Sequence, residues 1–150
     1  MQFISNSIEN THHYAAQLLS YLKTNLICLY GDLGSGKTTF VQGLAQALGI
    51  KKRIISPTFI IVKEYPIHYP LPITHLPITH YPSLIHIDCY RLHSALDAKS
   101  FNFQELWSNP KNLVVIEWAE KIKPILPKKR IDIKFEYINK NKRSLEIVNC

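Results

Sequence analysis

Residues 31–38 read GDLGSGKT and match every fixed position of the pattern GxxxxGK(S/T), which constrains the fold more than any other feature of the chain. The five residues before it, 26–30, form a continuous apolar run that is typical of a strand buried on both faces. After it, the apolar positions of residues 41–48 recur at helical spacing, and Gly49 is placed to end that helix. Since the pattern requires a preceding strand and a following helix, the match predicts a phosphate-binding loop.

Such a loop binds a polyphosphate because its main-chain N–H groups converge on the anion, and the following helix adds the positive end of its dipole. Lys37 is placed to reach the β- and γ-phosphates of a nucleotide, and the Thr38 hydroxyl is a ligand for Mg²⁺. The alternative is a glycine-rich turn before a helix, and the flanking elements favour nucleotide binding over it. We predict that eight residues of this segment bind the nucleotide: Asp32, Leu33, Gly34, Ser35, Gly36, Lys37, Thr38 and Thr39.

The composition is that of a globular protein, with 46% hydrophobic and 19% charged residues over 150 positions, and the length predicts one domain, 1–150. No run approaches the roughly 18 apolar residues of a membrane span, and no basic segment precedes an apolar core at the N-terminus. Three cysteines, Cys28, Cys89 and Cys150, have no metal-ligand spacing. We therefore expect buried thiols at Cys28 and Cys89, and a protein of the reducing cytoplasm that does not contact a membrane.

The formal net charge is +7, and half of the 18 basic residues lie between Lys121 and Arg143. This asymmetry permits contact with a nucleic acid or an acidic protein, and a solvated basic face is an equal alternative.

The segment between the phosphate-binding helix and the next strand is irregular. Residues 54–62 are apolar and strand-like but are interrupted by Ser56, Pro57 and Thr58. In nucleotide-hydrolysing proteins a Thr in such a loop can sense Mg²⁺ and the γ-phosphate, although a turn residue is the default interpretation of Thr58. Residues 65–82 are rich in Pro and His and contain LPITH twice in tandem, which predicts an extended surface loop. His68, His75 and His80 lack a diagnostic ligand spacing, so a metal site there is disfavoured.

Two predicted strands end in a carboxylate. Residues 83–92 alternate and carry Asp88 near their end, and residues 113–116 are four apolar residues followed by Glu117. Open α/β sheets place their chemistry outside the carboxyl ends of their strands. Glu117 has the position of a Walker B acid, usually Asp, that holds Mg²⁺; a surface ion pair is the alternative.

The remaining elements complete the fold prediction. We expect an amphipathic helix over 8–22 with Ser7 as its N-cap, a helix over 94–106, and a hairpin of residues 131–138 and 144–148. The order predicts an α/β fold of the P-loop NTPase type, with a mostly parallel sheet flanked by helices and a C-terminal antiparallel β-hairpin at the edge.

Five stretches together resemble one family. They are GDLGSGKTT at 31–39, SPTF at 56–59, HIDCYRL at 86–92, IEW at 116–118 with Glu120, and ILP at 125–127. In this order, over nearly the whole chain, they resemble the TsaE family, small bacterial P-loop ATPases of tRNA threonylcarbamoyladenosine biosynthesis. The sequence departs from the family pattern at Cys89, where Leu is usual, and in the long loop at 65–82.

The resemblance implies that the chain binds ATP or ADP with Mg²⁺ and hydrolyses ATP slowly by itself. It implies two partners, the threonylcarbamoyl transferase and its paralogous binding protein, with any contact to tRNA indirect. It also implies residue roles: Lys37 on phosphate, Thr38 and Glu117 on Mg²⁺, Thr58 in a switch-like loop, Asp88 near the γ-phosphate, and Trp118 beside the nucleotide. Either Asp88 or Glu117 would orient the attacking water.

Two other functions remain open at this point. One is a nucleotide-gated module that binds partners and has little catalytic role. The other is a small metabolite kinase, against which the sequence shows no arginine-rich lid segment and no second substrate pocket.

Overall fold

The computed structural model describes residues 1–56, 61–69 and 81–148. Within these ranges one sheet of seven strands has the order β1-β7-β6-β2-β5-β4-β3. The strands are β1 (Gln2–Ser5), β2 (Leu26–Tyr30), β3 (Val62–Pro66), β4 (Ser83–Asp88), β5 (Asn112–Glu117), β6 (Ile131–Tyr137) and β7 (Arg143–Val148). The helices are α1 (Ile8–Leu19), α2 (Lys37–Ala47), α3 (Ala95–Lys99), α4 (Phe103–Ser108) and the 3₁₀ helix η1 (Ala119–Ile125).

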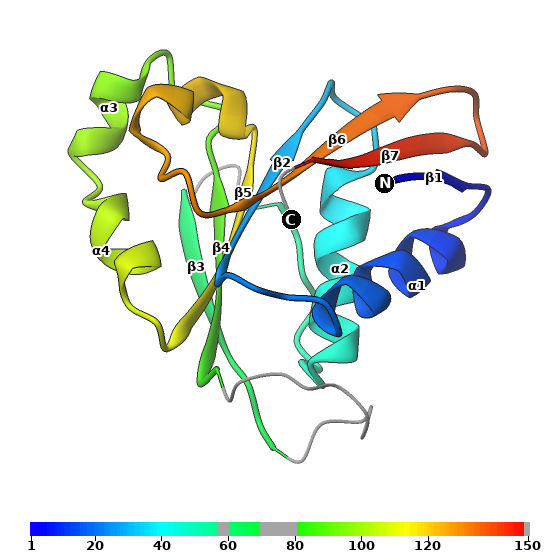
Figure 1. Cartoon of the computed structure of the whole chain (residues 1–150), viewed down its shortest axis with the longest axis horizontal. Helices are drawn as coiled ribbons and strands as arrows, with labels where there is room; N and C mark the ends of the chain where they lie inside the picture. Colours follow the sequence, from blue (N-terminus) through cyan, green and yellow to red (C-terminus); the bar gives the residue numbers. More distant parts are fainter. Residues whose placement is uncertain (57–60, 70–80, 149–150) are drawn as a thin grey trace.

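The four central strands β6, β2, β5 and β4 are parallel, and antiparallel strands flank them on both sides. Helices α1 and α2 cover one face of the sheet, and α3, α4 and η1 cover the other (Figure 1). The predicted fold class is therefore confirmed. Strand β1, which the sequence analysis did not identify, pairs antiparallel with β7 beyond the predicted hairpin and brings Ser5 opposite Arg143.

Alternation along the central strands divides the core into two layers. In β2, Ile27 and Leu29 pack toward α1 and α2, whereas Leu26 and Cys28 pack toward α4 and η1. The same alternation in β4 and β5 sends Leu84, Leu113 and Val115 into the first layer. Residues two positions further along these strands share that face, so the polar groups at the carboxyl ends of β4 and β5 point to the side of α2.

Several element boundaries differ from the prediction; the strand expected over 83–92, for example, ends at Asp88. The helix expected over 8–22 ends at Leu19, because the Ser20 hydroxyl and main-chain N–H both donate to Gln17 O. The single helix expected over 94–106 is two short helices, since Asn102 has a left-handed backbone (φ 52°) that interrupts the helix. The strand expected over 54–62 overlaps β3 only at Val62, and β3 continues to Pro66, so it includes the first two residues of the loop expected over 65–82. The predicted caps are confirmed, with Ser7 accepting from Asn10 N and Gly49 at φ 70°.

Several sequence predictions lie outside the described residues: those on Thr58, His75, His80, Cys150 and the LPITH repeat at 71–80. Within the described ranges, no helix has both the length and the apolar composition needed to cross a membrane.

Both cysteines in the described ranges lie in the core. Cys28 and Cys89 are free thiols with no exposed surface, and burial raises the pKa of Cys28 strongly and that of Cys89 to about 12. Because only the thiolate is nucleophilic, we expect iodoacetamide to leave both unmodified in the native chain at pH 8. Peptide mass spectrometry checks this, with the same reaction in urea as the control. Labelling of either thiol at its urea rate would contradict the burial of these strands.

Candidate functional site

The polar residues of interest gather at the carboxyl ends of β2, β5 and β4. The glycine-rich loop follows β2 directly, and Glu117 ends β5 in register with Leu29 of β2. Asp88 ends β4 in register with Glu117. Parallel pairing thus places the loop and both carboxylates at one edge of the sheet, as expected for an open α/β fold.

The loop holds its predicted shape through backbone conformations that glycine favours. Gly31, Gly34 and Gly36 have φ values of 134°, 76° and 107°, and Gly36 directly precedes the first residue of α2. The first turn of α2 therefore opens toward the concave side of the loop, which is the arrangement that binds an anion.

Lys37 is buried at the base of the loop, with only 4% of its surface exposed. Its Nζ donates to Gly31 O at 2.5 Å and to Asp32 O at 2.9 Å. The ammonium also lies 4.0 Å from the centroid of the Trp118 ring. Burial lowers the pKa of Lys37, and the negative charge of Glu117 opposes this shift. Within the described residues no carboxylate lies within ion-pairing distance of Nζ, and the negative charges of Glu117, Glu120 and Asp88 act on it from further away.

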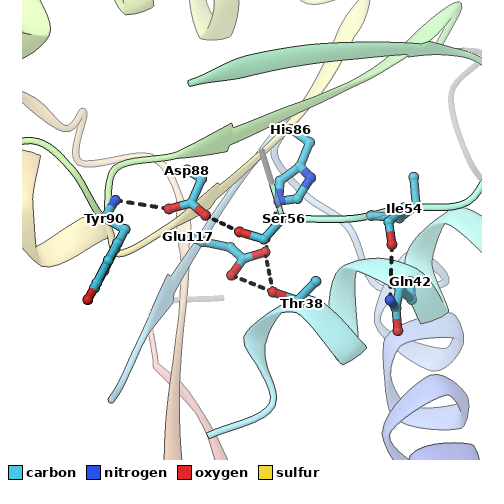
Figure 2. A network of polar contacts seen from close by, with 8 residues as sticks. All are labelled: Thr38, Gln42, Ile54, Ser56, His86, Asp88, Tyr90 and Glu117. Atoms are coloured by element: carbon cyan, nitrogen blue, oxygen red, sulfur yellow. Dashed lines mark hydrogen bonds and ion pairs between the residues drawn. The ribbon is translucent and has the colours of Figure 1, made fainter. Parts of the chain in front are cut away.

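Glu117 is the centre of a buried polar cluster (Figure 2). It is 2% exposed, and the Thr38 hydroxyl lies 3.0 Å from Oε1 and 2.9 Å from Oε2. His86 Nε2 lies 2.9 Å from Oε1. A carboxylate and a hydroxyl side by side are hard oxygen donors, which is the ligand type that Mg²⁺ prefers. The described residues contain no cluster of three or more His, Cys, Asp or Glu side chains that could hold a metal ion.

Asp88 is held by two donors on opposite sides. Its Oδ1 accepts from the Tyr90 main-chain N–H at 2.9 Å, and its Oδ2 accepts from the Ser56 hydroxyl. Figure 2 shows Asp88 beside Glu117, with the Ser56 hydroxyl directed toward Asp88. The Tyr90 ring packs at 4.9 Å from that of Trp118, whose backbone is left-handed (φ 57°). These two aromatic rings border the cluster.

A cavity of about 730 Å³ joins these groups, a size suited to a nucleotide. Of the predicted nucleotide-binding residues, seven line it: Leu33, Gly34, Gly36, Lys37, Thr38, Thr39 and Trp118. Asp32 and Ser35 do not line it; the main-chain carbonyl of Asp32 and the Ser35 hydroxyl accept hydrogen bonds from Lys37 Nζ. Asp88 and Glu117 also line the cavity.

The opposite end of the cavity consists of residues to which the sequence analysis gave no role in the site. They come from the β1–α1 connection and the β6–β7 turn: Asn6, Ser7, Ile8, Lys140, Asn141 and Arg143. Arg143 Nε donates to Gly34 O at 3.2 Å and its Nη1 donates to Asn139 O at 2.6 Å, which ties the turn to the tip of the loop. No local motif marks these residues, because only the pairing of β1, β7 and β6 brings them to the site. Ser56 was noted only as part of a strand interruption and of the SPTF motif, with no role of its own in the site.

Comparison with known proteins identifies one family. The model of the family described as "Threonylcarbamoyl adenosine biosynthesis protein TsaE" matches residues 5–145. The tRNA threonylcarbamoyladenosine biosynthesis protein TsaE of Aquifex aeolicus (strain VF5) is 35% identical over 149 residues, which cover 97% of this chain and 94% of that protein. Its counterpart in Rickettsia bellii (strain RML369-C) is 34% identical over 150 residues, with coverage of 99% and 94%. In fold, the chain is similar to the crystal structure of Bacillus subtilis YdiB, with a TM-score of 0.73, 24% identity, and coverage of 100% of this chain and 86% of that one.

Proposed function

The chain belongs to the TsaE family of threonylcarbamoyladenosine biosynthesis proteins, and on that premise we propose that residues 1–150 form the Mg²⁺-dependent ATPase component of the machinery that installs the threonylcarbamoyl group on adenosine in tRNA. The observation that carries the proposal is the convergence of a buried ammonium, a hydroxyl–carboxylate pair and a second carboxylate on one cavity. Phosphoryl transfer to water depends mainly on positioning and charge neutralisation, which such a set supplies.

The roles follow from the contacts. Lys37 and the main-chain N–H groups of the loop would hold the β- and γ-phosphates of ATP, because Lys37 Nζ lies against the loop carbonyls and has no competing ion pair in the described residues. Thr38 and Glu117 would hold Mg²⁺, which when bound neutralises charge on the phosphate oxygens. Asp88 would then orient the attacking water, since Glu117 is directed toward Thr38 and Asp88 lies next to it.

The two ends of the cavity suggest how ATP lies in it. The carboxylates end β4 and β5 on one side of β2, so the γ-phosphate would lie at that end. The β6–β7 turn is on the other side of β2, and with the β1–α1 connection it would contact the nucleoside. Asn6 and Asn141 offer hydrogen-bonding groups there, and Ile8 offers an exposed apolar surface for a base.

The Thr58 role stays a prediction. Thr58 lies outside the described ranges. Ser56, two positions earlier, donates a hydrogen bond to Asp88. Ser56, which leads into Thr58, is therefore bonded to a carboxylate that would face the γ-phosphate. This contact supports a switch-like role for Thr58.

The proposal predicts that the purified chain binds one ATP in a Mg²⁺-dependent way and releases phosphate without any added acceptor. Calorimetry measures the first and a phosphate-release assay the second. Adding the threonylcarbamoyl transferase and its paralogous binding protein should accelerate release. Absence of binding heat with a folded chain would contradict the proposal. Phosphate transfer only to an added metabolite would indicate a kinase, and partner binding that responds to ATP without hydrolysis would indicate a gated module.

A further inference from the structure

His86 is a buried titratable residue to which the proposed mechanism gives no role. It has no exposed surface and lies on β4, two residues before Asp88 and in register with Val115 of β5. Its neighbours Ile85 and Ile87 point into the opposite core layer, so the His86 ring shares the face of Asp88 and Glu117. Figure 2 shows it next to Glu117, on the side away from Tyr90.

The hydrogen bonds of Glu117 require a donor from His86. An ionised carboxylate only accepts, and the Thr38 hydroxyl carries one hydrogen, which it can give to only one of the two carboxylate oxygens at a time. When Glu117 is ionised, His86 Nε2, at 2.9 Å from Oε1, is the donor of this contact, and the ring is in the tautomer that carries its hydrogen on Nε2. His86 Nδ1 has no hydrogen-bond partner within the described residues. The contact with Glu117 is thus the hydrogen bond that offsets the cost of burying the polar His86 ring in the core.

A purely packing role fits these observations poorly. A buried polar atom without a partner costs free energy, and an apolar side chain of similar size would avoid that cost at Nδ1. A buried carboxylate, by contrast, is costly unless donors surround it, and the His86 ring supplies one donor while Thr38, which lines the cavity, supplies another. The His86 ring therefore contributes more by stabilising the buried Glu117 carboxylate than by packing in the core.

We propose that His86 is a positioning residue: its Nε2–H holds the Glu117 carboxylate in the orientation that faces Thr38, and so sets the affinity of the Glu117–Thr38 pair for Mg²⁺. This inference rests on the proposed function. Ligand carboxylates are commonly hydrogen-bonded by a second residue, and loss of that residue typically costs roughly 10- to 100-fold in metal affinity or activity.

Two variants separate positioning from packing. In His86→Gln the side-chain amide nitrogen reaches about as far as Nε2 and can donate to Glu117, whereas in His86→Asn it is one methylene too short. We expect His86→Asn to weaken Mg²⁺-dependent ADP binding roughly 10-fold or more by calorimetry, with Mg²⁺-free ADP binding unchanged. His86→Gln should rescue most of the loss. His93→Asn, at an exposed histidine, is the matched control and should behave as wild type.

The same pattern should appear in hydrolysis. His86→Asn should raise the Mg²⁺ concentration for half-maximal ATP hydrolysis, while the KM for ATP at saturating Mg²⁺ stays unchanged. Equal behaviour of the Gln and Asn variants, whether both impaired or both normal, would overturn the inference. If wild type neither binds nor hydrolyses ATP, the proposed function fails instead.

A nucleotide-free measurement tests the hydrogen bond itself. In ¹⁵N spectra of the ligand-free wild-type chain, the His86 ring should show a protonated Nε2, with its signals assigned by their loss in His86→Gln. A ring protonated at Nδ1 alone would overturn the inference whatever the nucleotide assays show. This measurement decides the question even if His86→Asn does not fold.

Discussion

Replacing Lys37 with alanine should reduce ATP hydrolysis roughly 100- to 1000-fold, the usual cost of removing a preorganised charge from the reacting group. The Lys37 ammonium lies against the carbonyls of Gly31 and Asp32 and the ring of Trp118, so it is fixed before any substrate arrives. A fixed charge needs no reorganisation when negative charge moves onto the phosphate oxygens. Phosphate release at saturating ATP and Mg²⁺ measures the effect.

The Lys37 variant should remain folded. Lys37 itself lines the cavity, so water can enter the space that its side chain leaves and bind the carbonyls of Gly31 and Asp32. We therefore expect a change of about 1 kcal/mol or less in the free energy of unfolding. Lys111→Ala is the control, because Lys111 is an exposed lysine just before β5, at the opposite end of the sheet. Wild-type hydrolysis by folded Lys37→Ala would mean that the loop does not hold the reacting phosphates.

Replacing Gly31 with alanine should lower the free energy of unfolding by about 2 to 6 kcal/mol, from backbone strain and overpacking together. Gly31 has a φ of 134°, which side chains other than hydrogen rarely tolerate. A Cβ there would also lie 2.4 Å from Phe135 O. That oxygen belongs to the backbone of β6, which pairs with both β2 and β7 and so cannot move away.

Gly34→Ala separates the two contributions. Gly34 also has positive φ, 76°, but a Cβ there would meet no atom within 4 Å. We expect it to cost only about 1 to 2 kcal/mol, the price of a left-handed residue. Urea denaturation of both variants, in the absence of nucleotide, measures the difference. Equal destabilisation by the two would show that the close approach to β6 does not constrain the loop.

The parts of the site that the sequence revealed are those encoded by local patterns. The loop was recognisable because its glycines, Lys37 and Thr38 have fixed spacing between a strand and a helix. Asp88 and Glu117 were recognisable because each follows a buried apolar run, and parallel pairing alone then brings them to the loop. The same reasoning gave the fold class without any knowledge of strand order.

The parts that it did not reveal depend on long-range contacts or on single backbone angles. Arg143 reaches Gly34 only because β6 pairs with β2, and nothing near residue 143 indicates this. Asn102 interrupts a helical segment through one left-handed residue, which apolar spacing cannot show. His86 appeared in a family-like motif, but its contact with Glu117 follows from strand register and alternation.

The pairing of Ser5 with Arg143 has a consequence for the newly made chain. This pairing joins β1 to β7, the first and last strands of the described residues, and Ser5 and Arg143 both line the cavity. Closing so long a stretch of chain costs entropy that local contacts cannot offset early. A chain still emerging from the ribosome would therefore have its phosphate-binding loop before it has a complete nucleotide pocket. Firm ATP binding would mark the moment at which synthesis has passed β7.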